Sequence, residues 1–154
     1  MCLADVGNNQ VWAGSYYIYI IDGQTLRCNR APLTDHADAV VSIVVVDGGR
    51  IVYTASADGE ILKWDVQTMT VKDKYSEKFP SLKNLKFYNG FLWCGTWRAI
   101  YKMDLDGNLI KKYAVSTSQS SVEVDSFHIT ETGEIWASTD ALALEGDEGR
   151  DNLR

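Results

Sequence analysis

The sequence predicts an all-β fold made of repeated antiparallel units. Four segments share one order of side chains (apolar, aromatic, small, small, hydroxyl): Val11–Ser15, Val52–Ser56, Leu92–Thr96 and Ile135–Thr139. Their aromatic residues, Trp12, Tyr53, Trp93 and Trp136, are separated by 41, 40 and 43 positions, and this recurrence at one strand position predicts that the tryptophans belong to the blade core. A repeat of about 40 residues with strand character is typical of β-propeller blades, which have four strands each.

The second repeat shows the strands most clearly. It begins with the apolar, mostly β-branched run Ala39–Val46, which ends at Asp47-Gly48-Gly49. The runs Arg50–Ser56 and Glu60–Asp65 follow, joined by Ala57-Asp58-Gly59. Short β-rich runs joined by Asp-Gly turns predict an antiparallel meander.

This repeat resembles a WD40 blade. It ends with Trp64-Asp65, the dipeptide for which WD40 repeats are named. Five residues separate Asp58 from Trp64, and 21 separate His36 from Asp58. In WD40 blades a loop His, a strand Ser or Thr, a turn Asp and a Trp form a hydrogen-bonded tetrad. The resemblance assigns this structural tetrad to His36, Thr54 (or Ser56), Asp58 and Trp64.

The repeats divide the chain into about three and a half blades, a partial WD40-like propeller. The expected parts are an N-terminal flank at 1–10, a partial blade at 11–35, complete blades at 36–80 and 81–120, a partial blade at 121–139 and an acidic, disordered tail at 140–154. Propellers close with four to eight blades. The chain is therefore expected to be a piece of a longer polypeptide, or to pair with the missing blades or a second copy.

Composition and charge narrow the function classes. The formal net charge is −6, whereas nucleic-acid binding proteins are usually basic. Cys2, Cys28 and Cys94 form no zinc spacing or disulfide framework, which favours a reducing compartment. The N-terminus lacks a secretory signal, and the longest apolar run is too short to span a membrane. These features predict a soluble, cytoplasmic protein.

Lysines gather in the middle of the chain, at Lys72, Lys74, Lys78, Lys83 and Lys86. Lysine on an exposed blade edge prevents aggregation between sheets, and this explains the cluster most simply. An acidic partner is the alternative.

The sequence contains no catalytic motif. A phosphate-binding loop, a dinucleotide-binding turn, a zinc-protease helix and a nucleophile elbow are all missing. We therefore expect no enzyme activity, catalytic residue, cofactor or metal, and we assign His128 to a strand.

Trp97 and Arg98 interrupt the repeat where a turn Asp would stand, and they are the candidate contact with a partner. Asp22, Asp65 and Asp104 recur at strand ends, where turn roles suffice.

Three segments extend the resemblance: YIYIID at Tyr17–Asp22, DGEILKWDV at Asp58–Val66 and GFLWCGT at Gly90–Thr96. Their order is similar to the C-terminal propeller of a DENN-domain family. The resemblance implies a non-catalytic scaffold in a Rab guanine-nucleotide exchange factor of vesicle trafficking, with partners in the Rab GTPase pathway. The 154 residues do not include the DENN module, so no exchange activity is assigned to them. The alternatives are a ligand-binding or sensory propeller, and a truncated fragment without independent activity.

Overall fold

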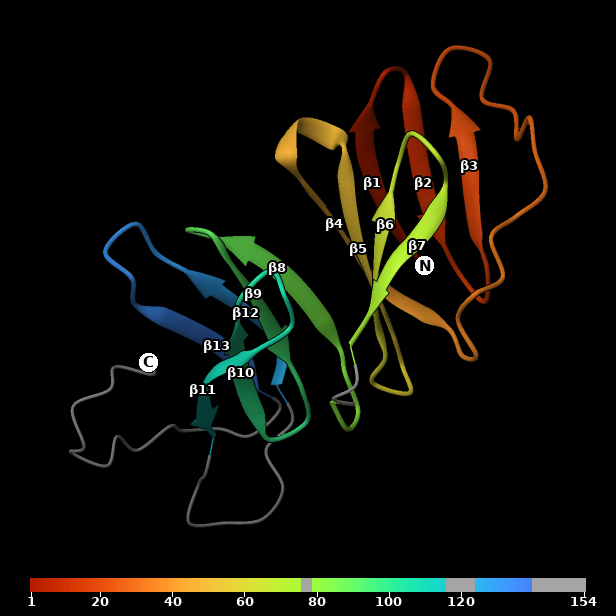
Figure 1. Cartoon of the computed structure of the whole chain (residues 1–154). Coiled ribbons are helices and arrows are strands. Elements are labelled where there is room, and N and C mark those ends of the chain that lie inside the picture. The colour runs from red at the N-terminus through yellow and green to blue at the C-terminus, as the bar shows by residue number, and fades with distance from the viewer. Residues whose placement is uncertain (76–78, 116–123, 140–154) are drawn as a thin grey trace.

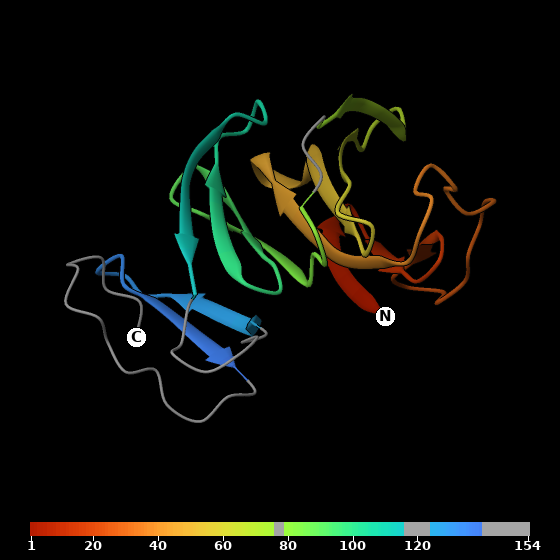
Figure 2. The ribbon, with the colours of Figure 1, turned by 90° about the horizontal axis from the view of Figure 1, so that it is seen from below.

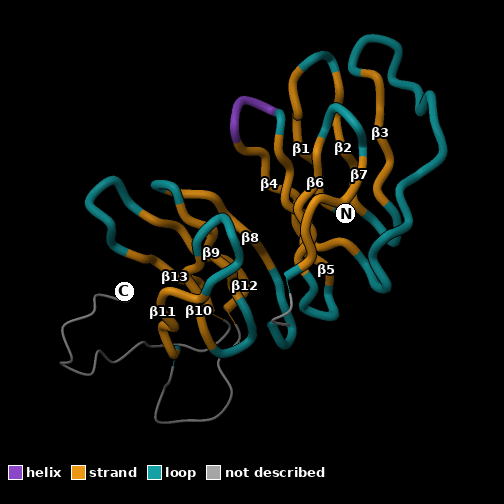
Figure 3. Tube along the Cα trace, in the orientation of Figure 1, coloured by secondary structure: helices purple, strands orange, loops and turns teal. Residues whose placement is uncertain are grey.

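The computed structural model describes residues 1–75, 79–115 and 124–139. Almost all regular structure in this part of the chain is antiparallel strand, as the sequence predicts, and the only helical element described is the short 3-10 turn η1 (Asp47–Gly49) (Figure 3). The strands form four sheets, here called blades 1 to 4 in chain order (Figure 1). Blade 1 contains β1 (Cys2–Gly7), β2 (Gln10–Gly14) and β3 (Ile18–Asp22); blade 2 contains β4 (Val40–Val46), β5 (Ile51–Ser56), β6 (Ile61–Asp65) and β7 (Thr70–Lys74). Blade 3 contains β8 (Asn84–Tyr88), β9 (Phe91–Gly95), β10 (Ala99–Met103) and β11 (Leu109–Ala114); blade 4 contains β12 (Val124–Ile129) and β13 (Ile135–Thr139).

The blades follow one another around an arc (Figure 2). The first strand of each blade lies beside the first strand of the next, so β1, β4, β8 and β12 form the inner side. Within each blade, successive strands pair with their sequence neighbours. The loops from second to third strand therefore all lie at one end of the strands, and the turns from first to second strand lie at the other.

The hydrophobic core consists of clusters between consecutive blades. Trp12 of blade 1 and Trp64 of blade 2 are buried edge to face, with ring centroids 5.9 Å apart. Phe79 contacts Tyr101 between blades 2 and 3, at 5.0 Å. Phe127 of blade 4 packs in a third cluster with Trp93 of blade 3. Burial of these faces holds the blades together.

The N-terminal residues differ from the expected flank. Cys2–Gly7 forms β1, which pairs with β2 and lies against β4. Its side chains alternate between exposed and more buried, and Val6 enters the core. The outer edge of blade 1 is irregular, with isolated bridges from Ile21 to Cys28 and from Ile18 to Leu33.

The aspartates at strand ends organise turns, as expected. Asp22 accepts hydrogen bonds from the backbone N–H groups of Gln24 and Thr25, and Asp104 accepts them from Asp106 and Asn108. These bonds, together with hydrogen bonds from the Thr25 hydroxyl and the Asn108 side chain, lower the pKa of both carboxyl groups. Asp65 accepts from the N–H of Thr68 in the same way.

The repeated aromatic position is only partly a core position. Trp12, Tyr53 and Trp93 are at most 5% exposed, as the repeat predicts. Trp136 is 53% exposed, which corrects the expectation that it belongs to the blade core. No described strand covers its side of the two-stranded blade 4. The expected acidic tail at 140–154 lies outside the described residues.

Candidate functional site

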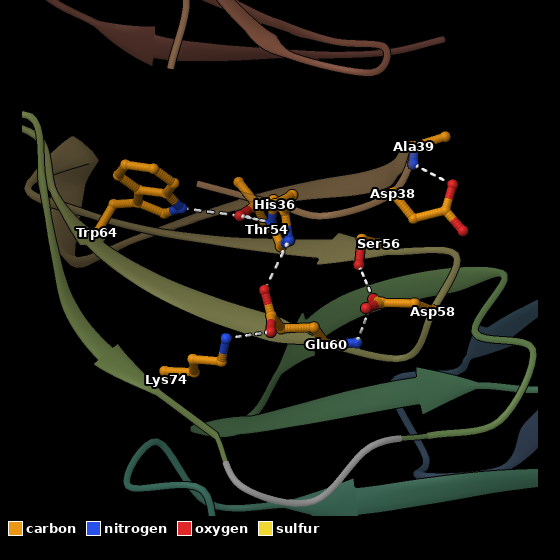
Figure 4. A network of polar contacts seen from close by, with 9 residues as sticks. All are labelled: His36, Asp38, Ala39, Thr54, Ser56, Asp58, Glu60, Trp64 and Lys74. Atoms are coloured by element: carbon orange, nitrogen blue, oxygen red, sulfur yellow. Dashed lines mark hydrogen bonds and ion pairs between the residues drawn. The ribbon is translucent and has the colours of Figure 1, made fainter. Parts of the chain in front are cut away.

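A buried polar network joins the loop before blade 2 to the middle strands of that blade (Figure 4). Thr54 on β5 is fully buried, and its Oγ1 lies 2.6 Å from Nε2 of His36. Trp64 on β6 donates from Nε1 to the same oxygen at 2.8 Å. One hydroxyl group therefore connects a loop with two strands of the blade.

Glu60 completes the network on the other side of the imidazole. Its carboxylate lies 3.4 Å from Nδ1 of His36, although the two atoms are outside hydrogen-bond geometry. The other carboxylate oxygen pairs with Nζ of Lys74 on β7 at 2.5 Å. Glu60 is only 3% exposed and Lys74 is 61% exposed, so the lysine links a buried carboxylate to the surface. This hydrogen bond raises the pKa of Lys74.

The surroundings of His36 favour a neutral ring. Burial lowers its pKa, against the opposite effect of the nearby carboxylates of Glu60 and Asp58. A carboxylate cannot donate a hydrogen bond, so Nδ1 facing Glu60 carries the proton of the neutral ring. Nε2 is then an acceptor, and the hydroxyl of Thr54 donates to it while accepting from Trp64.

Asp58 lies in the turn between β5 and β6. Its Oδ1 accepts hydrogen bonds from the hydroxyl of Ser56 and from the N–H of Glu60. Gly59 follows with a φ of +90°, a left-handed conformation that glycine adopts without strain. Of the four predicted tetrad residues, the structure joins His36, Thr54 and Trp64 through one oxygen. Ser56, the alternative to Thr54, bonds Asp58 instead, and a direct role for Asp58 at His36 stays a prediction.

The order hydroxyl, imidazole, carboxylate is also that of catalytic triads. Here Thr54 is 0% exposed, and its oxygen already accepts the indole N–H of Trp64. A substrate has no access to such a hydroxyl, so the geometry does not fit Thr54 as a nucleophile, and a structural role for the network stays a prediction. Among the described residues, no group of three or more His, Cys, Asp or Glu side chains could hold a metal ion.

The exposed loops between second and third strands form a separate candidate site. Trp97 is 44% exposed, and the guanidinium of Arg98 lies 5.5 Å from the centre of its ring. Tyr16 and Tyr17 occupy the equivalent loop of blade 1 and are 68% and 45% exposed. We call Tyr16, Tyr17, Trp97 and Arg98 the loop face, because all four lie at the same end of the strands.

Sequence reasoning identified only part of these sites. The two tyrosines were missed, yet the repeat contains the signal: Gly14-Ser15 precedes Tyr16 just as Gly95-Thr96 precedes Trp97. Glu60 and Lys74 were also missed as members of the network. Glu60 follows a turn glycine, where an exposed carboxylate would be ordinary, yet in the fold it is buried beside His36.

Known structures identify the fold. The chain superposes on the crystal structure of the WD40 β-propeller domain of Doa1 with a TM-score of 0.73. The fold is that of a WD40 β-propeller. The alignment covers 89% of this chain and 46% of the Doa1 domain, at 19% sequence identity. The described residues therefore form part of a propeller, and the sheet is not closed.

A curated relative shows similarity in sequence as well. DENN domain-containing protein 3 of Mus musculus is 33% identical to this chain over 99 residues, and the match covers 62% of the chain. The match spans 8% of the length of that relative. No family model matches the chain.

Within the described residues, no helix has the length and apolar character needed to cross a membrane.

Proposed function

We propose that this part of a propeller is a non-catalytic scaffold that binds a protein through its loop face. Exposed aromatic and arginine side chains at equivalent loops of blades 1 and 3 carry this proposal. Tyr, Trp and Arg are enriched among the residues that dominate binding energy at protein interfaces. The buried network of blade 2 holds the loops between these two sites in place.

The finer proposal places the chain in the propeller of a DENN-type Rab guanine-nucleotide exchange factor of vesicle trafficking, in the cytoplasm. The similarity to DENN domain-containing protein 3 supports it. In this role the propeller would bind a component of the Rab pathway, and exchange itself would belong to a DENN module. A panel of purified Rab GTPases, loaded with GDP or a GTP analogue, tests this part directly.

The experiment for the scaffold role uses two matched variants. Proteins captured on the tagged chain are identified and purified, and their binding is then measured by interferometry. Trp97→Ala with Arg98→Ala is expected to weaken binding at least about thirtyfold, which corresponds to about 2 kcal/mol, the size of an interface hot spot. Arg50→Ala with Gln67→Ala, at the opposite end of blade 2, is expected to bind like the unmodified chain. If no protein binds saturably, or if both variants bind normally, the proposal is wrong.

A cavity supports the ligand-binding alternative. It has a volume of about 570 Å³ and lies among the turns of blades 1 and 2, at the end opposite the loop face. Its polar lining includes Asn8, Gln10, Arg50, Gln67 and Lys72. A small molecule that raises the melting temperature of the chain, and does so less for Gln67→Ala, would favour this function.

A further inference from the structure

Blade 3 is basic within an acidic chain. Residues 82–115 contain six Lys or Arg and two Asp, whereas the whole chain has a net charge of −6. Both aspartates, Asp104 and Asp106, lie in the turn between β10 and β11. Asp104 accepts hydrogen bonds from the backbone of that turn.

Three of the lysines lie in one row across the blade. Trp93 on β9 is directly opposite Lys86 on β8 and Lys102 on β10, and Lys102 is directly opposite Lys111 on β11. Like charges at directly opposite positions of a sheet destabilise it. Nζ of Lys102 lies 3.9 Å from the centre of the Phe91 ring and 5.3 Å from that of Trp93, which offsets part of this cost.

The outer strand of blade 2 provides an internal comparison. Its lysines have acidic partners: Lys72 pairs with Asp65 at 3.2 Å, and Lys74 pairs with Glu60 at 2.5 Å. In blade 3, Lys102 and Lys112 contact aromatic rings. Neither has a carboxylate within ion-pair distance among the described residues. Lys112 occupies the position in blade 3 that Lys74 occupies in blade 2, so the same position of two neighbouring blades differs in whether its charge has an acidic partner.

The edge of blade 3 offers more than charge. Among the described residues, β11 is the terminal strand of its sheet, so the backbone groups on its outer side have no strand beside them in this part of the chain and could pair with a further strand. Leu109 and Ile110 at its start are 42% and 53% exposed. Lys111 and Lys112 on the same strand repel another basic edge, which disfavours pairing between copies of this blade.

We propose that the outer half of blade 3, strands β10 and β11, binds an acidic, extended segment of a protein partner. Lys102 shares a face of the sheet with Lys111, and Lys112 lies on the other face with Tyr101. Carboxylates at successive positions of such a segment would therefore approach Lys102 and Lys112 from the two faces, its apolar side chains would contact Leu109 and Ile110, and its backbone would pair with β11. A lipid surface could balance the charge but cannot use the strand edge. This inference rests on the proposed scaffold function and specifies the chemistry of the partner.

The test uses the full chain and a labelled peptide of Val-Val-Glu-Glu repeats, which presents carboxylates to both faces of the sheet, with a peptide of Val-Val-Gln-Gln repeats as control. Saturable binding of the Glu peptide is expected, and it weakens as salt is added. Lys102→Gln with Lys112→Gln is expected to bind at least about fivefold more weakly. Arg50→Gln with Lys72→Gln removes the same charge from blade 2 and is expected to change affinity less than about twofold.

Three results would overturn the inference. The first is no saturable binding of the Glu peptide, and the second is an equal loss in both double variants. The third is binding of vesicles that contain phosphatidylserine, lost in Lys102→Gln with Lys112→Gln, while the peptide does not bind. Unchanged melting temperatures confirm that the variants are folded. If a protein partner still binds through the loop face, only the inference about blade 3 falls, and the scaffold function stands.

Discussion

The carboxylate of Glu60 lies 3.4 Å from Nδ1 of His36, and neither side chain is more than 3% exposed. This contact places an acid and a base in the interior of blade 2, next to the loop that enters the blade. Buried polar groups rigidify a fold when they are satisfied and cost stability when one partner is removed. The network therefore gives the most direct tests of how blade 2 is held together.

Thr54→Val removes the hydroxyl that joins His36 and Trp64 while keeping the shape of the side chain. We expect the free energy of unfolding to fall by about 2 kcal/mol or more, because two buried partners lose their hydrogen bond. Urea denaturation followed by tryptophan fluorescence measures the change. Thr68→Val removes an exposed hydroxyl and should change stability by less than about 0.5 kcal/mol. Equal midpoints for the two variants would contradict the network.

Glu60→Gln separates the role of Glu60 from that of Asp58. The variant removes the charge that pairs with Lys74 and faces the neutral ring of His36, and we expect a loss of about 1.5–3 kcal/mol, the size of a hydrogen bond to a charged group. Glu131→Gln changes an exposed carboxylate and serves as the control. Asp58→Asn is expected to lose stability through the turn, because Asp58 accepts hydrogen bonds from Ser56 and the N–H of Glu60. A loss for Glu60→Gln no larger than that for Glu131→Gln would contradict the role of Glu60 in the network.

Stability should fall on mild acidification because of His36. Its pKa is lowered by burial in the folded chain, whereas a histidine in the unfolded chain titrates near pH 6.5. The unfolded state then binds more protons than the folded state below about pH 6.5, so stability is lost as the pH falls, by at most about 1.4 kcal/mol per pH unit. Denaturation midpoints between neutral and mildly acidic pH measure this slope. His36→Gln should flatten it, and His128→Gln, which changes an exposed histidine, should not.

Gly59→Ala should be more harmful than the same change at another turn glycine. A Cβ at Gly59 would lie 2.2 Å from the carbonyl oxygen of Phe79, and its φ is +90°. Gly133 has a φ of +86°, and a Cβ added to it would have no neighbouring atom within 4 Å. Gly133→Ala should therefore cost only the conformational strain, about 1–2 kcal/mol. Thermal unfolding should show a clearly larger loss for Gly59→Ala. Equal losses would mean that Phe79 does not pack on this turn.

The repeat in the sequence predicted the strands well, because each blade places an aromatic residue at the same point of its second strand. It did not predict β1, whose segment contains Asp5 and Gly7 and lacks a run of β-branched residues. That strand forms because its neighbours β2 and β4 offer a backbone edge and an apolar surface. Such a tertiary effect overrides local propensity.

The site was predicted less completely. His36, Thr54 and Trp64 followed from spacing, since the WD40 resemblance fixes their positions. Glu60 could not be found in this way, because its burial depends on a loop that precedes it by more than twenty residues. Lys74 enters the network only because β7 pairs with β6 beside it.

Hydrogen exchange measured with and without a bound protein tests the central claim, that the loop face is a protein-binding surface. The partner is the purified protein recovered on the tagged chain. We expect slower exchange in the loops that contain Tyr16 and Trp97, with no change in the turn at Asp47–Gly49. Slower exchange confined to that turn, or none in either loop, would contradict it.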